Sequence, residues 1–163
     1  MKEKRLVLLL CLMFLLSGCT KTPPTPFEDI DLICNSQIGL PAGKSYVLSA
    51  PADDAAHPSD TLLSALYGNG GMPIALDLVE DAAFFFSYVC ACEFAVFYCK
   101  TADGTEEVAK MCLQRLDTLK HYWTDDTSVA MLERAGVTVR GRQVFLYICN
   151  DPEAALRAFR RTL

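Results

Sequence analysis

Residues 82–99 limit the possible folds of this chain most, because these eighteen consecutive residues contain one charged side chain, Glu93. A run of this length and apolarity is compatible with a transmembrane helix. However, a carboxylate near its middle would cost about 2.5 kcal/mol or more in a bilayer. The aromatic residues and valines of the run also favour strands. We therefore predict strands over Ala83–Cys90 and Glu93–Lys100, joined tightly near residues 91–92, with a transmembrane helix as the alternative.

Helical periodicity and capping residues divide the remaining sequence. The best-defined helix runs from Asp103 to about Trp123 and carries an apolar stripe at helical spacing. Asp103 and Glu106 are expected to form its capping box, and Glu106 to pair with Lys110. Further helices are predicted over Phe27–Ile38, Thr61–Tyr67, Pro73–Asp81, about 124–136, and from Pro152 onward; short strands are predicted over Lys44–Pro51, Val137–Arg140 and Gln143–Cys149.

This order of elements indicates the fold class. Two strands are adjacent in the sequence, and no βαβ unit is repeated along the chain. That pattern favours an α+β fold over a doubly wound one. We expect a small antiparallel sheet with helices packed on one face, in a single domain covering residues 27–163.

The N-terminus has the three parts of an export signal. Lys2, Lys4 and Arg5 precede an apolar run, Leu6–Leu16, which is too short to span a bilayer but suits a signal peptide. Leu16, Ser17, Gly18 and Cys19 follow at once. This tetrapeptide resembles the bacterial lipobox, and the resemblance implies that residues 1–18 are removed and that Cys19 receives a diacylglyceryl group. An ordinary secretory signal with a chance cysteine is the alternative.

A diacylglyceryl anchor predicts the location of the protein. Two acyl chains suffice for stable attachment, so we expect a lipid-anchored protein on the extracytoplasmic face of the cell membrane. Residues 19–26 contain three prolines and read as a stiff spacer. Removal of residues 1–18 takes away three of 15 basic and one of 20 acidic residues, which leaves a net charge of −7. An acidic domain argues against a nucleic-acid partner and is expected to stand off an anionic surface.

Six cysteines remain besides Cys19. An even number in an extracytoplasmic protein permits disulfides, but free cysteines are also among the most buried residues. Zinc is disfavoured because the two closest thiols are separated by one residue and no histidine is nearby. Buried thiols, one or more disulfides, and a metal site therefore stay open for Cys34, Cys90, Cys92, Cys99, Cys112 and Cys149.

One loop carries a local acidic and histidine cluster, Asp53, His57 and Asp60. Carboxylates and an imidazole could hold a divalent metal, although a polar loop with a helix cap explains the same residues. No catalytic motif and no glycine-rich phosphate loop is recognisable, so we predict neither an enzyme nor a cofactor. The favoured hypothesis is a binding or accessory module for an unidentified envelope protein or ligand. The alternative is a surface enzyme or metal-binding protein that uses this loop.

Several short motifs occur in an informative order. They are Leu66-Tyr67-Gly68, Glu93-Phe94-Ala95-Val96-Phe97, Glu106-Glu107-Val108, Arg140-Gly141-Arg142 and Val144–Ile148. Together with the lipobox, this order resembles an uncharacterised lipoprotein family of Gram-positive bacteria, domain of unknown function 4358. The similarity covers about residues 27–163, and the loop before Glu93 is shorter here. The family implies a location and no activity, so it assigns no catalytic residue.

Overall fold

The structure, a computed structural model, describes residues 25–68, 71 and 73–161. The lipobox with Cys19 and the signal peptide lie outside this part of the chain. The helices are α2 (Pro26–Asn35), α3 (Asp60–Tyr67), α4 (Gly104–Tyr122), α5 (Asp126–Glu133) and α6 (Pro152–Arg161), with a 3₁₀ turn η1 at Ile74–Leu78. The strands are β1 (Gly43–Val47), β2 (Val79–Ser87), β3 (Glu93–Cys99), β4 (Gly136–Arg140) and β5 (Gln143–Ile148).

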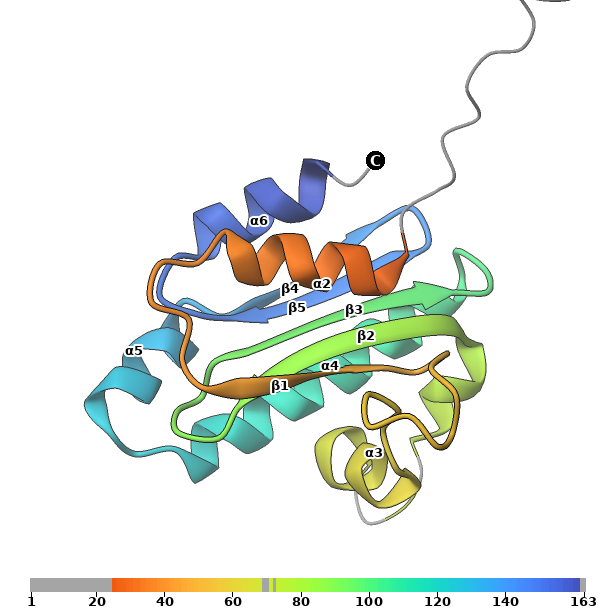
Figure 1. The fold of residues 1–163 in the computed structure, drawn as a ribbon, viewed down its shortest axis with the longest axis horizontal. Coiled ribbons are helices and arrows are strands. Elements are labelled where there is room, and N and C mark those ends of the chain that lie inside the picture. The colour runs from red at the N-terminus through yellow and green to blue at the C-terminus, as the bar shows by residue number, and fades with distance from the viewer. Residues whose placement is uncertain (1–24, 69–70, 72, 162–163) are drawn as a thin grey trace, which may run out of the picture.

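The strands form one five-stranded sheet in the order β1-β2-β3-β5-β4, and all neighbours are antiparallel (Figure 1). This confirms the α+β class and the antiparallel sheet. The β2–β3 hairpin predicted from residues 82–99 forms the centre of the sheet. In the described residues, no helix combines the length and apolarity needed to cross a membrane. A two-residue turn joins β4 to β5, and Gly141 takes φ 58° there, as the first position of a type II′ turn requires.

The helices cover both faces of the sheet, so the prediction of one covered face is wrong. Helices α2 and α6 pack together over one face, whereas α4 lies across the opposite face with α3 beside it (Figure 1). The cause lies in the central strands, whose side chains are apolar on both sides. Phe85 and Phe94 are buried toward α2 and α6, while Phe84 and Phe97 are buried toward α3 and α4. A sheet that is apolar on both faces must be covered on both.

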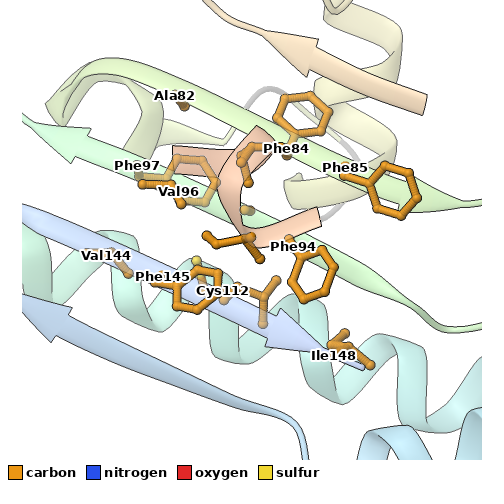
Figure 2. Close-up of a cluster of buried hydrophobic side chains, with 14 of the residues drawn as sticks. Ala82, Phe84, Phe85, Phe94, Val96, Phe97, Cys112, Val144, Phe145 and Ile148 are labelled. Atoms are coloured by element: carbon orange, nitrogen blue, oxygen red, sulfur yellow. The ribbon is translucent and has the colours of Figure 1, made fainter. Parts of the chain in front are cut away.

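The core follows the three central strands. Figure 2 shows aromatic side chains from β2, β3 and β5 gathered with Cys112 from α4. Phe145 stacks on Phe159 of α6 with ring centroids 4.7 Å apart, and Tyr67 of α3 meets Phe97 edge to face at 5.3 Å. Both helical layers are therefore attached to the sheet through aromatic contacts.

Several local predictions need correction. The first helix ends at Asn35 rather than Ile38, and the first strand ends at Val47. The helix predicted over Pro73–Asp81 is a 3₁₀ turn followed by strand from Val79, because residues from Val79 onward pair with β3. Asp103 makes no side-chain capping bond. Its backbone is already helical there, which turns the carboxylate away from the first amides of α4. By contrast, the predicted Lys110–Glu106 ion pair forms at 2.9 Å.

The two ends of the sheet have different neighbours. The side-chain amide of Gln37, just after α2, donates from Nε2 to the carbonyl of Asp151 at the start of α6, so the two helices run antiparallel. The β2–β3 turn lies at this same end, because Tyr88 N donates to Ala42 O. We call it the turn end. The start of α2, the end of α6 and the β4–β5 turn share the other end, which we call the tether end (Figure 1).

Candidate functional site

A buried ion pair joins the central strand to the long helix. The Arg115 side chain of α4 donates from Nη2 to Glu93 Oε2 at 2.7 Å and from Nε to the same oxygen at 3.1 Å. The hydroxyl of Tyr67 donates to Glu93 Oε1 at 3.3 Å. Side-chain exposure is 2% for Glu93 and 12% for Arg115. The carboxylate at the start of β3 is therefore held from two helices.

Burial and the ion pair shift the pKa values of Arg115 and Tyr67. Burial disfavours the charge on Arg115, but the Glu93 carboxylate outweighs this effect and holds the pKa of Arg115 above its ordinary value. Burial, followed by the charge of Glu93, raises the pKa of Tyr67 well above its usual range. The phenol therefore stays neutral and donates its proton in a hydrogen bond. A buried pair with this geometry fixes the position of α4 on the sheet more than it adds stability.

A pocket of about 290 Å³ opens beside the ion pair at the turn end. Its polar lining includes Glu93, Arg115 and Thr118, together with Ser87 at the end of β2. The other walls come from the β2–β3 turn and from the last turn of α4, with its two aromatic residues Tyr122 and Trp123. Their rings meet edge to face with centroids 5.4 Å apart. The arrangement is an apolar pocket with a few fixed polar groups, which is the usual composition of a ligand site.

The β2–β3 turn that walls the pocket is attached to α5. The amide of Ala91 donates to the hydroxyl of Ser128 at 3.0 Å, and Ser128 is fully buried. The amide of Ser128 in turn donates to the N-cap carboxylate of Asp125 at 2.9 Å. This chain of hydrogen bonds connects a helix start to the pocket wall, so the shape of the pocket depends on the docking of α5.

Large apolar side chains stand exposed around this pocket. Tyr88 and Val89 of the turn are 58% and 65% exposed, and Tyr122 is 75% exposed. Single exposed apolar residues are ordinary, but a group of them beside a pocket is typical of an interaction site. The pocket and its rim together form the candidate binding surface of the described part of the chain.

The acidic and histidine loop does not gather into a site. His57 Nδ1 lies 2.8 Å from the carbonyl oxygen of Ala50, and Asp60 is the first residue of α3, which Ser59 caps. Asp53 is exposed. Among the described residues, no group of three or more histidine, cysteine, aspartate or glutamate side chains is arranged to hold a metal ion. Leu16, Ser17, Gly18 and Cys19 lie outside the described residues.

All six cysteines of the described domain carry free thiols, and five of them are buried. Cys34 at the end of α2 is half-buried, and burial together with the charge of Asp31 raises its pKa to about 12. Cys112 of α4 lies against the sheet, where burial raises its pKa well above the ordinary range. Cys34 and Cys112 are therefore poor nucleophiles in the folded domain.

Arg115 is the residue that sequence reasoning missed. The apolar stripe of α4 includes Cys112, Leu116 and Leu119, and Arg115 lies on the same side of the helix as these residues. The sequence contained two unexplained charges of opposite sign. Arg115 is a basic residue in register with an apolar stripe, and Glu93 is the single carboxylate in an apolar strand. Pairing them would have predicted the contact between β3 and α4.

Comparison of the chain with protein-family models, curated proteins and solved structures finds no match. The resemblance to the Gram-positive lipoprotein family accordingly stays a prediction.

Proposed function

We propose that this protein is a lipid-anchored binding module of the cell envelope, and that the pocket beside Glu93 and Arg115 is its binding site. The anchor is the diacylglyceryl group expected on Cys19, at the extracytoplasmic face of the membrane. The observation that carries the proposal is the position of the pocket relative to this anchor. The pocket opens at the turn end, whereas the chain enters the domain at Pro26, at the tether end (Figure 1).

This arrangement points the pocket away from the lipid surface. Residues 20–25 would connect Cys19 to the start of α2, so the tether end is the end of the domain that faces the headgroups. Four exposed arginines lie at that end: Arg140, Arg142, Arg160 and Arg161. Arg140 Nη1 donates to the carbonyl of Arg160, which joins the β4–β5 turn to the end of α6. Cationic side chains are attracted to anionic headgroups, so these arginines favour the same orientation although the mature chain is acidic.

The size and charge of the pocket indicate which kind of ligand it binds. Sites for small ligands enclose roughly 300–1,000 Å³, and this pocket of about 290 Å³ is at the lower limit. The charges of Glu93 and Arg115 already neutralise each other, so no unpaired charge is offered to a ligand. One bulky apolar or aromatic side chain of a partner protein fits this description. Buried side chains of this kind contribute most of the binding energy at protein interfaces.

A photocrosslinking experiment in intact cells tests the binding site. A photoreactive residue at Tyr122 should crosslink one envelope protein, whereas the same residue at Val139, which is exposed on β4, should not. Ala65 is exposed and lines the pocket, so Ala65→Trp would occupy the pocket without entering the core. This variant should lower the crosslinked yield at least tenfold. The matched control Ala102→Trp, at an exposed position outside the pocket, should leave the yield unchanged.

The anchor is tested separately. Cys19→Ala should move the domain from the membrane fraction to the medium, or leave an unprocessed precursor. Normal processing with unchanged membrane retention would overturn the anchor. Equal crosslinking from the Ala65→Trp and Ala102→Trp variants would overturn the pocket. A loss of function in folded, anchored His57→Ala/Asp60→Ala protein would instead favour the alternative site in the 53–60 loop.

A further inference from the structure

Cys92 and Cys149 flank the last paired residues of β3 and β5 at the turn end of the sheet. The β3–β5 register ends with Glu93 paired to Ile148, so Cys92 and Cys149 each lie one residue beyond the end of the ladder. On the other side of Cys92 its carbonyl accepts the amide of Ser87 at 2.9 Å, so its backbone is held next to the end of β2.

The hydrogen-bond pattern makes this step favourable for a crosslink. Cys99 N donates to Arg142 O at 2.7 Å, so these two residues form a hydrogen-bonded pair. Such pairs alternate along an antiparallel ladder, so the step after Glu93 and Ile148 is a non-hydrogen-bonded position. In a regular ladder the Cα atoms at such a position are about 4.5 Å apart. A disulfide requires roughly 4.4–6.8 Å between Cα atoms, so the backbone need not move far.

The side chains share one face of the sheet. Glu93 points toward α4, and side chains alternate along a strand, so Cys92 and its partner point toward α2 and α6. Burial raises the pKa of the Cys92 thiol, and negative charge on Cys90, Cys149 or Cys34 would raise it further. Cys90 Sγ, however, is turned toward the hydroxyl of Ser87 at 3.5 Å.

We propose that Cys92 and Cys149 are a disulfide-forming pair of the mature protein. The oxidant is an external disulfide, either of a thiol-oxidising envelope protein or of a small molecule. The Cys149 thiolate attacks it, forming a mixed disulfide and releasing one thiolate. The Cys92 thiolate then attacks Cys149 Sγ, forming the S–S bond and releasing the second thiolate. The two released thiolates take up the two protons lost by the cysteines, so two thiols are oxidised and one external disulfide is reduced.

The bond is expected to form during folding. Both thiols are buried in the folded domain, with exposures of 3% for Cys92 and 1% for Cys149, so an external disulfide reaches them before this end of the sheet closes. An oxidant in the cell requires the extracytoplasmic location that forms part of the proposed function. Refolding in a defined redox buffer does not require it, so the two proposals fail independently.

The test is refolding of the full mature chain, isolated from its host, in buffer containing glutathione and glutathione disulfide. After acid quenching and alkylation, cleavage after glutamate separates the cysteines into peptides 29–80, 81–93, 94–106, 108–133 and 134–153. Mass spectrometry should find peptide 81–93 linked to peptide 134–153. Cys92→Ala should abolish this link, and Cys90→Ala, the matched control on the same peptide, should retain it.

Thermal unfolding supplies a second measurement on the unmutated chain. Closing a long loop should raise Tm of the chain refolded with glutathione disulfide by about 10 °C over the chain kept reduced. Alkylation of all six thiols after oxidative refolding would overturn the proposal. So would a dominant link to another cysteine, or a link that survives Cys92→Ala.

Discussion

Arg115 reaches from α4 to Glu93 on β3 with its Nη2 2.7 Å from Oε2, and this contact fixes the long helix at the edge of the candidate pocket. Both charges are removed from water, so each depends on the other. Removing one partner of a buried ion pair leaves the other charge uncompensated. The same contact therefore supports both the fold and the shape of the site.

Arg115→Ala should lower the free energy of unfolding by about 3–5 kcal/mol, because it leaves the Glu93 carboxylate buried without a cation. Urea unfolding measures the loss. Arg157→Ala is the matched control, since Arg157 pairs with Glu153 on the exposed face of α6. Exposed pairs contribute about 0.2–1 kcal/mol. Equal losses in the two variants would contradict the buried pair.

Leu116→Ala tests the orientation of α4. Leu116 is 6% exposed and belongs to the core, whereas Leu113 on the same helix is 51% exposed. Removal of a buried leucine side chain costs about 2–5 kcal/mol, so Leu116→Ala should destabilise the protein by that amount. Leu113→Ala should change the free energy of unfolding by less than about 0.5 kcal/mol. The reverse order would mean that α4 presents another face to the sheet.

Ser128→Ala should loosen the pocket wall. It removes the acceptor of the buried Ala91 amide, and an unsatisfied buried donor costs about 1–3 kcal/mol. Faster hydrogen exchange should appear at the β2–β3 turn, measured on the folded protein by mass spectrometry. Thr127→Ala, at the neighbouring exposed position, should leave exchange at that turn unchanged. If hydrogen exchange at the turn is unaltered in Ser128→Ala, the order of the turn does not depend on its contact with α5.

The stability of the reduced protein should fall at alkaline pH. Cys34 has its pKa raised from 9.0 to about 12 by burial and by Asp31, so the folded state holds this proton when the unfolded state has released it. The resulting stabilisation is complete below pH 9 and is lost as pH rises through about 12. Buried Tyr67 and Cys112, whose pKa values are also raised, act in the same direction.

Urea unfolding in reducing buffer at pH 8, 9.5 and 11 measures this effect. Cys34→Ala removes the one proton that Cys34 keeps in the folded state. The free energy of unfolding should then decrease less steeply with pH, by up to about 1.4 kcal/mol per pH unit. Ser36→Ala changes a side chain that does not titrate at the same helix end, so it should keep the slope of the unmutated protein. An identical slope in both variants would show that Cys34 does not retain its proton on folding.

Local sequence determined most of the elements. The aromatic residues and valines around the single Glu93 indicated the β2–β3 hairpin, and Pro152 correctly indicated the start of α6. The strands predicted over Val137–Arg140 and Gln143–Cys149 left residues 141–142 for the β4–β5 turn. These features depend on backbone geometry and on contacts within a few residues, which a sequence carries directly. The six thiols, in contrast, were left without an assigned arrangement.

Only the tertiary structure decided which surfaces meet. The sequence of a strand that is apolar on both sides does not determine which helix packs on which face. For that reason the prediction of one covered face was wrong. The pairing of Glu93 with Arg115 joins residues 22 positions apart, and the alignment of Cys92 with Cys149 depends on the register of two strands 57 positions apart. Such contacts depend on how whole helices and strands pack together. The residues next to each side chain in the sequence do not determine its partner. The sequence alone therefore predicted most of the secondary structure, and its expected location of the protein stays a prediction. The pocket and the proximity of Cys92 and Cys149 to the last β3–β5 pair came from the fold.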